Sequence, residues 1–175
     1  MTAAPPHSEP ASLLPGLRIL VIDDERAIHD DIRRVLKTSY RTDEDLAALE
    51  ALLFNGNEDP SNQGSANELP ECEILSEYQG QDAVQRLEQE LGQGRRFDLA
   101  IVDMRMPPGW DGLRTVEELW KRDESLPVAF CTAYSDHTVE QVAQRLDRDS
   151  IPWLSKPFHS QQLKDIVRRH ARGAG

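Results

Sequence analysis

Acidic and polar side chains follow directly after short apolar runs at several points along the chain. Each has an ordinary explanation by itself, since an acid after a strand is often a helix cap and a terminal threonine or lysine is often solvated. If each of these polar residues had only its ordinary role, their occurrence after one apolar run after the next would be a series of coincidences. We therefore interpret them as one site. They are Asp23 and Asp24, Asp103, Thr132 and Lys156.

The residue types predict phosphoryl transfer beside a magnesium ion. Three carboxylates gathered in a partly desolvated cleft would repel one another and raise their pKa values unless a cation lay among them. Oxygen ligands with room for water suit Mg²⁺, and no cluster of cysteines and histidines indicates zinc. An ionised aspartate can act as the nucleophile and form an acyl phosphate. Lys156 can neutralise charge on the transferred group, and the Thr132 hydroxyl can donate to one of its oxygens.

The segments that would position this site alternate between strand and helix patterns. Ile19–Ile22 is a short apolar run of the kind that is buried on both faces of a parallel sheet. The stretch after it places Ile28, Ile32 and Leu36 on one helical face. Four further strands, each followed by a helical pattern, are expected over residues 73–75, 99–102, 128–131 and 151–154.

This alternation predicts an α/β fold with a doubly wound, five-stranded parallel sheet and right-handed crossovers. The expected strand order is 2-1-3-4-5, in which ligands bind beyond the carboxyl ends of the strands. The candidate site residues all stand at that edge.

Two regions fall outside the repeating pattern. Residues 1–16 are rich in proline, alanine and serine and predict a disordered tail before a domain over 17–171. Residues 40–70 separate the first helix from the second strand by more than a usual turn, which indicates an acidic insertion of one helix and a loop. We interpret the insertion as a solvated decoration, with a docking site as the alternative.

Composition narrows the class of protein. The chain has 20 Lys and Arg against 31 Asp and Glu, and the net charge of −11 disfavours direct nucleic-acid binding. No apolar run approaches the roughly 20 residues that span a bilayer, and no signal peptide begins the chain, so we expect a cytoplasmic protein without a membrane partner. Cys72 and Cys131 lie in apolar segments and are expected to be reduced core residues. The histidines lack metal spacing, and surface or helix-end roles are expected for His7, His29, His137, His159 and His170.

Five sequence blocks in order resemble the signature blocks of the receiver family of two-component response regulators. They are Arg18–Glu25, Val102–Pro107, Asp111–Gly112, Cys131–Ala133 and Trp153–Phe158. The resemblance covers roughly residues 17–171 apart from the insertion. It implies a flavodoxin-like receiver fold and a phosphoacceptor that receives its phosphoryl group from a histidine kinase.

The resemblance also implies roles for individual residues. Asp103 would be the phosphoacceptor, and Mg²⁺ would be bound by Asp24, Asp103 and the backbone carbonyl of Arg105, with Asp23 assisting through water. Thr132 would be a ligand of the phosphoryl oxygens.

Lys156 would share that role with Thr132, and the Lys156–Pro157 peptide would be cis. Phosphorylation would draw Thr132 inward and let Trp153 fill the space, which would switch a surface formed by the fourth helix, fifth strand and fifth helix. The family usually has Tyr or Phe where Trp153 stands, so a purely structural aromatic is the alternative. The same surface is the candidate interface of a homodimer.

The sequence departs from the family pattern at one loop, and it does not settle how long a phosphoryl group would persist. The loop over 106–112 is one residue longer than the common pattern, and Trp110 in it is expected to pack on its own loop more than on a partner. The resemblance implies that Arg105 and Tyr134 lie where the family tunes the lifetime of the phosphoryl group, but the sequence does not give the direction of their effect.

Two other functions fit these residues less well. An aspartate-nucleophile phosphatase needs a second aspartate two residues after the nucleophile, and Arg105 stands there instead. A receiver-like module that binds proteins without phosphorylation would not need all five site residues. The chain is therefore expected to be a signalling phosphoacceptor and not an enzyme, with either a separate downstream target or a fused output domain.

Overall fold

The computed structural model describes residues 16–38, 69–133, 142, 145–146 and 151–171. Several predictions fall wholly or largely outside these residues: residues 1–15 of the expected tail over 1–16, residues 40–68 of the expected insertion over 40–70, and most of the expected helix around residues 139–146. His7, His137 and Tyr134 lie outside them as well. No helix in the described part of the chain has the length and apolar character that crossing a bilayer requires.

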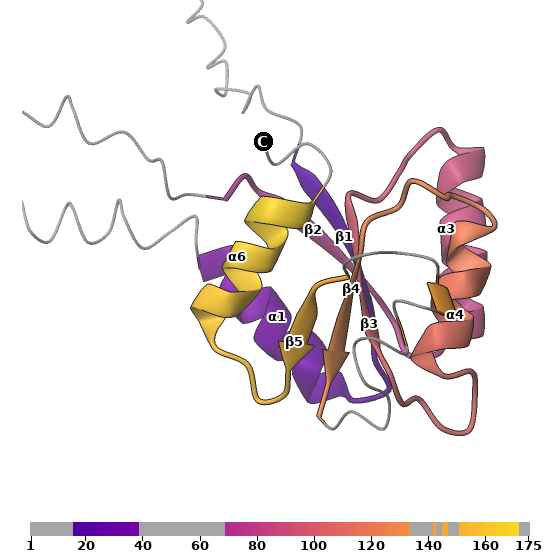
Figure 1. Cartoon of the computed structure of the whole chain (residues 1–175). Coiled ribbons are helices and arrows are strands. Elements are labelled where there is room, and N and C mark those ends of the chain that lie inside the picture. Colours follow the sequence, from indigo (N-terminus) through magenta and orange to yellow (C-terminus); the bar gives the residue numbers. More distant parts are fainter. Residues whose placement is uncertain (1–15, 39–68, 134–141, 143–144, 147–150, 172–175) are drawn as a thin grey trace, which may run out of the picture.

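A five-stranded parallel sheet forms the centre of the molecule (Figure 1). Its order is β2-β1-β3-β4-β5, which confirms the predicted topology. The predicted bounds were too short for the second strand and two residues early for the fifth. The strands are β1 (Leu17–Ile22), β2 (Cys72–Glu77), β3 (Leu99–Asp103), β4 (Val128–Thr132) and β5 (Trp153–Ser155).

Helices cover both faces of this sheet (Figure 1). Alternate residues of the buried strands point to opposite faces: Leu20 and Ile22 join one hydrophobic cluster, and Ile19 and Val21 join another. The first cluster packs under α3 (Gly80–Gly92) and α4 (Gly112–Trp120), the second under α1 (Arg26–Thr38) and α6 (Ser160–His170). Residues 142, 145 and 146 are also helical.

Two smaller predictions concern the core. Cys72 and Cys131 are free and buried, as expected, and burial raises the pKa of Cys72 to about 11 and that of Cys131 to about 12. Leu69 is buried in the cluster beneath α1 and α6. Leu69, which falls within the predicted insertion over 40–70, therefore packs with the core.

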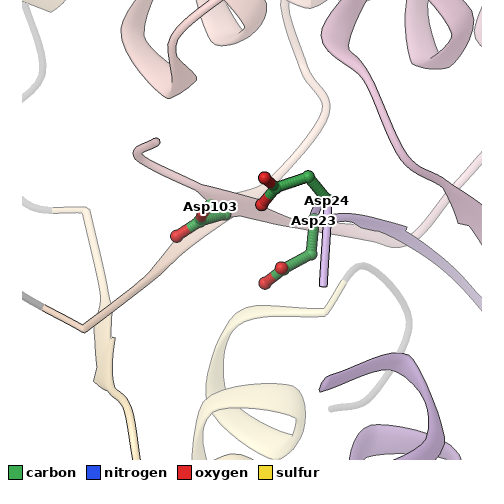
Figure 2. A group of neighbouring side chains, drawn as sticks. All are labelled: Asp23, Asp24 and Asp103. Atoms are coloured by element: carbon green, nitrogen blue, oxygen red, sulfur yellow. The ribbon is translucent and has the colours of Figure 1, made fainter. Parts of the chain in front are cut away.

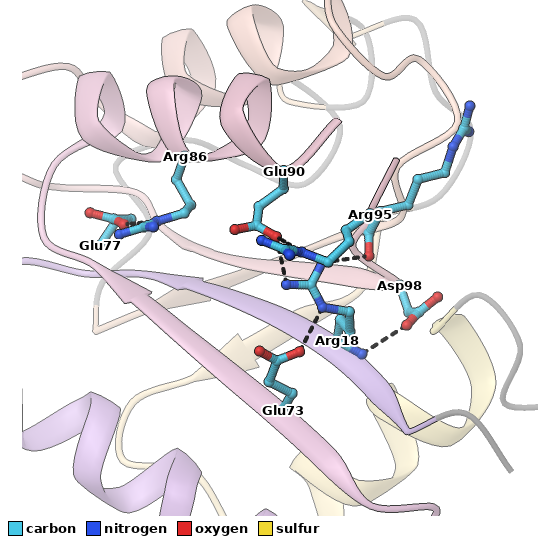
Figure 3. Close-up of polar contacts among 8 residues, drawn as sticks. Arg18, Glu73, Glu77, Arg86, Glu90, Arg95 and Asp98 are labelled. Carbon is cyan, nitrogen blue, oxygen red and sulfur yellow. Dashed lines mark hydrogen bonds and ion pairs between the residues drawn. The ribbon is translucent and has the colours of Figure 1, made fainter. Parts of the chain in front are cut away.

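The two ends of the sheet carry different polar groups. Asp23, Asp24 and Asp103 gather at the carboxyl end, the first two just after β1 and the third at the end of β3 (Figure 2). At the amino end, the side chain of Arg18 on β1 binds Glu73 at 2.6 Å and Glu90 at 2.8 Å (Figure 3). This second group fixes α3 to the start of β1 and lies away from the candidate site.

Glu90 is the centre of the amino-end network. Its side chain is buried and also accepts from Arg95 Nε at 2.6 Å. The hydrogen bond from Arg95, with that from Arg18, lowers the pKa of Glu90 to about 2 although burial opposes the shift.

We expect Glu90→Gln to lower the free energy of unfolding at pH 7 by about 2 kcal/mol, the size typical of a hydrogen bond to a charged group. Because the pKa of folded Glu90 lies below its usual 4.5, this stabilisation is present above that value and disappears as the pH falls toward about 2. Urea unfolding of both proteins at pH 7 and pH 3 measures the difference. Glu88→Gln on α3 is the control, because the ion pair of Glu88 with Arg122 is exposed and should contribute little to stability. An equal loss at both pH values would show that the charge of Glu90 is not what stabilises the fold.

Candidate functional site

Three carboxylates converge at the carboxyl edge of the sheet. Asp23 and Asp24 follow β1, and Asp103 is the last residue of β3, the strand beside it. One oxygen from each carboxylate lies within 4.8 Å of the others (Figure 2). The structure thus brings together the acidic residues that the sequence placed in one site. Asp23 and Asp103 are buried, whereas Asp24 is exposed.

Lys156 is the cation of this group. Its Nζ lies 2.6 Å from Asp23 Oδ2 and 3.3 Å from Asp103 Oδ1, and its side chain is only 10% exposed. Burial lowers the pKa of Lys156, but the ion pairs with the two aspartates outweigh it and the net shift is upward. The backbone N–H of Lys156 donates to the carbonyl of Thr132 at 2.8 Å, which ties the loop after β5 to the end of β4.

Asp103 is held in an environment that disfavours its charge. Burial raises its pKa to about 6, and the charge of Asp23 adds to the shift, while Lys156 and the backbone N–H of Arg105 oppose it. The three carboxylates carry three negative charges against one positive charge on Lys156. The site is therefore short of positive charge, which a divalent cation would supply.

The residues present fit a hard divalent cation. All three side chains offer oxygen, the ligand that Mg²⁺ prefers. Asp23 Oδ2 is buried and, among the residues that the structure describes, meets no donor in hydrogen-bond alignment, although it is ion-paired with Lys156. This oxygen has a lone pair left beside two further carboxylates, so it can accept from a water bound to the cation.

Thr132 and Trp153 lie on neighbouring strands but in different surroundings. Thr132 ends β4 at the site edge and is buried. Trp153 begins β5, and its ring packs against Phe130 with centroids 5.2 Å apart. Its indole N–H is buried and has no hydrogen-bond partner within the described part of the chain. Trp153 is thus a half-buried aromatic that packs against the core from β5, the strand next to that of Thr132.

Comparison with known proteins identifies the family. Residues 64–168, more than half of the chain, match the response regulator receiver domain. The chain belongs to this family.

Curated relatives of the receiver are response regulators. Response regulator MprA from Mycobacterium sp. (strain KMS) is 30% identical over 147 residues, which cover 84% of this chain and 47% of MprA. Response regulator protein FleR from Pseudomonas aeruginosa is 36% identical over 77 residues, which cover 44% of this chain and 16% of FleR. The receiver therefore spans less than half the length of either relative.

Solved structures support the fold of the receiver. The Vibrio cholerae chemotaxis protein CheY4 superposes with a TM-score of 0.59 at 18% identity, covering 89% of this chain and 98% of that one. A response regulator receiver domain from Clostridium thermocellum gives a TM-score of 0.58 at 20% identity, covering 87% and 91%. At such identities the similarity establishes the fold alone.

The loop after β3 of the receiver has a close backbone contact. A side-chain carbon at Gly112 would lie 2.5 Å from the Asp103 carbonyl oxygen, so only glycine lets α4 begin so near the site. Asp111 caps this helix by accepting from the Arg114 N–H at 2.8 Å. The Trp110 ring lies under the Arg114 guanidinium of α4 at 4.6 Å and packs on the core, whereas the sequence predicted packing on its own loop.

A cis peptide bond before one proline was predicted, and a cis peptide bond before another was not. The Lys156–Pro157 peptide is cis, which confirms that prediction. The Pro107–Pro108 peptide in the loop after β3 is also cis, and this was not predicted.

The prediction for the histidines was wrong for His29. His159 and His170 are exposed at the two ends of α6, as expected, but His29 is buried and bonded to the backbone of Asp23. A signal for this was present in the sequence. His29 stands three residues before Ile32 and seven before Leu36, so helical spacing places it on the buried face.

Proposed function

We propose that this receiver accepts a phosphoryl group on Asp103 from the phosphohistidine of a histidine kinase. The observation that carries the proposal is the cluster of Asp23, Asp24 and Asp103, with Lys156 paired to the first and the last of them, in a chain of the receiver family. The carboxylate of Asp103 forms a bond to phosphorus as the P–N bond of the donor breaks. The departing imidazole keeps the electron pair and takes a proton from solvent.

The residues of the site have complementary roles in this transfer. The attacking carboxylate needs no general base, because it is already ionised in the reacting form. Lys156 offsets charge on the transferred group, and the Thr132 hydroxyl donates to one of its oxygens. The ligands of Mg²⁺ would be Asp24, Asp103 and the Arg105 carbonyl, with Asp23 acting through water. When bound, the ion supplies positive charge against the carboxylates and the phosphoryl oxygens.

The proposed output is a change of protein-binding surface. Movement of Thr132 toward the phosphoryl group would open space for Trp153, which already lines a shallow pocket with Ile166 and Arg169 of α6. The target is a downstream protein, a fused output domain or a second copy of the chain. In this account the protein catalyses its own phosphorylation and dephosphorylation, and does not turn over a separate substrate.

Binding of beryllofluoride, which mimics a phosphoryl group, tests this function. We expect a saturable change in tryptophan fluorescence when beryllofluoride and Mg²⁺ are added together, and no change when EDTA removes the metal. Trp153→Phe should bind the mimic with similar affinity by calorimetry but lose most of the optical signal. Failure of the wild-type protein to bind would favour a module that acts without phosphorylation. An unchanged signal in Trp153→Phe would remove the switch role of Trp153.

A further inference from the structure

We propose that His29 is a positioning residue that holds the peptide between Asp23 and Asp24 and thereby sets the metal affinity of the site. The inference rests on the proposed function, because it assigns His29 to the same metal-binding turn. His29 lies in the first turns of α1 and is 1% exposed. It was not assigned to the site from the sequence.

Both ring nitrogens of His29 have partners. Nε2 lies 2.8 Å from the carbonyl oxygen of Asp23, and Nδ1 lies 2.8 Å from Ser76 Oγ on β2. A carbonyl oxygen can only accept, so Nε2 carries the proton in this contact. Ser76 Oγ in turn accepts from Arg33 Nη2 at 2.5 Å, which leaves its own hydrogen for Nδ1. The donors thus run in one direction, from Arg33 through Ser76 and His29 to the Asp23 carbonyl.

This series of hydrogen bonds ends at Asp23, a site residue that several further contacts hold in place. The Asp23 N–H donates to the Glu77 carbonyl at 3.2 Å, and Asp23 Oδ1 accepts from the Glu25 N–H at 2.9 Å. Lys156 lies against Oδ2. His29 supplies the remaining contact, to the carbonyl oxygen, so every polar atom of Asp23 has a neighbour of opposite polarity.

The carbonyl that His29 holds belongs to the peptide that leads into Asp24. A peptide group is planar, so fixing its oxygen also fixes the direction of the Asp24 N–H and Cα. Asp24 is exposed and has little packing of its own to orient its carboxylate. The bond from His29 therefore fixes the backbone from which the Asp24 carboxylate extends toward Asp23 and Asp103.

Core packing alone would explain why His29 is buried, but not why both of its ring nitrogens have hydrogen-bond partners. The His29 ring also packs against Tyr78 with centroids 4.8 Å apart. An apolar side chain of similar size could keep that contact. It could not replace the donor to Asp23, whose carbonyl would be left without the bond that His29 provides.

Two amide substitutions separate the two ring contacts. The Nε2 of glutamine is as many bonds from Cα as the Nε2 of histidine, so His29→Gln can keep the bond to Asp23. The amide of asparagine reaches only as far as Nδ1, so His29→Asn can keep the contact to Ser76 and loses the one to Asp23. Ile32→Ala, one turn later on α1 and fully buried, is a destabilising control that does not touch the site.

The readout is metal affinity measured on the whole chain. Mn²⁺, which takes the same oxygen ligands as Mg²⁺, is titrated by electron paramagnetic resonance and displaced by Mg²⁺. We expect binding about tenfold weaker in His29→Asn and within about twofold of wild type in His29→Gln, since outer contacts of metal ligands typically change affinity by 10–100-fold. Ile32→Ala should lose stability in urea and keep wild-type affinity.

The outcomes separate this inference from the proposed function. Equal affinities for wild type, His29→Asn and His29→Gln would overturn the positioning role while leaving the metal site intact. Equal weakening in His29→Gln, His29→Asn and Ile32→Ala would show that only packing matters, which also overturns it. A wild-type chain that binds neither Mn²⁺ nor Mg²⁺ would contradict the proposed function itself.

Discussion

Asp103→Asn is expected to abolish the phosphoryl adduct and, in EDTA at pH 7, to raise the free energy of unfolding. Burial raises the pKa of Asp103 from 3.8 to about 6, which means that folding an ionised Asp103 is unfavourable. Replacing it by a neutral residue of the same shape removes that cost, about 1–3 kcal/mol at about 1.4 kcal/mol per pKa unit.

The sign of the pH dependence follows from the same shift. Because the pKa of folded Asp103 is higher than that of the unfolded chain, its cost to stability is full above about pH 6 and disappears as the pH falls toward 4. The advantage of Asp103→Asn should shrink over that range. Mg²⁺ should also reduce the stability advantage of Asp103→Asn, because the cation offsets the negative charge of the wild-type site. Asp82→Asn, at an exposed aspartate in the first turn of α3, is the control: it should leave the adduct intact and should not raise the free energy of unfolding, because the Asp82 charge favours the helix N-terminus.

The outcomes of this comparison are distinct. A variant that still takes up a phosphoryl group from acetyl phosphate would assign the acceptor to another residue. A variant that loses the adduct and also loses stability would mean that the Asp103 carboxylate supports the fold, contrary to its raised pKa.

Lys156→Met should have the second largest effect. The ammonium group contacts both Asp23 and Asp103, so its removal leaves two buried carboxylates without their protein cation. We expect the free energy of unfolding in EDTA to fall by about 3 kcal/mol, as when one partner of a buried ion pair is removed. The rate of adduct formation should fall by about 100-fold, the usual size for one lost donor to a reacting oxyanion.

Added Mg²⁺ distinguishes the two roles of Lys156. The cation should restore much of the lost stability, because it supplies charge to the same carboxylates, but not the rate. Urea unfolding with and without Mg²⁺ and a time course of acetyl phosphate labelling measure the two effects. Lys164→Met on α6 is the matched control. An unchanged labelling rate in Lys156→Met would rule out the proposed contact with the phosphoryl group.

The sheet and the acidic cluster were predictable because strong local patterns specify them. Each of β1, β3 and β4 contains an uninterrupted run of four apolar residues, and the polar residue that follows this run must lie at the carboxyl edge. The bounds of the outer strands were harder to predict. β2 lies at an edge of the sheet and continues through polar Ser76 and Glu77, which a search for apolar residues leaves out. Pro152 has no N–H, so β5 begins only after it.

Other features of the site depend on tertiary contacts. Nothing in the sequence indicates that Lys156 lies nearer to Asp23 than to Asp103. The contact of His29 with the Asp23 carbonyl also requires β2, because Ser76 sets the orientation of the ring. Helical spacing places His29 on the buried face, but the identity of its partners comes from the fold.

The most direct test of the central claim identifies the phosphorylated residue chemically. The wild-type chain is incubated with acetyl phosphate and Mg²⁺, reduced with borohydride, which converts an acyl phosphate to an alcohol, and digested for peptide mass spectrometry. The account predicts homoserine at position 103 and at no other aspartate, and only when Mg²⁺ is present. Homoserine at Asp23 or Asp24, or an unmodified Asp103 under these conditions, would contradict it.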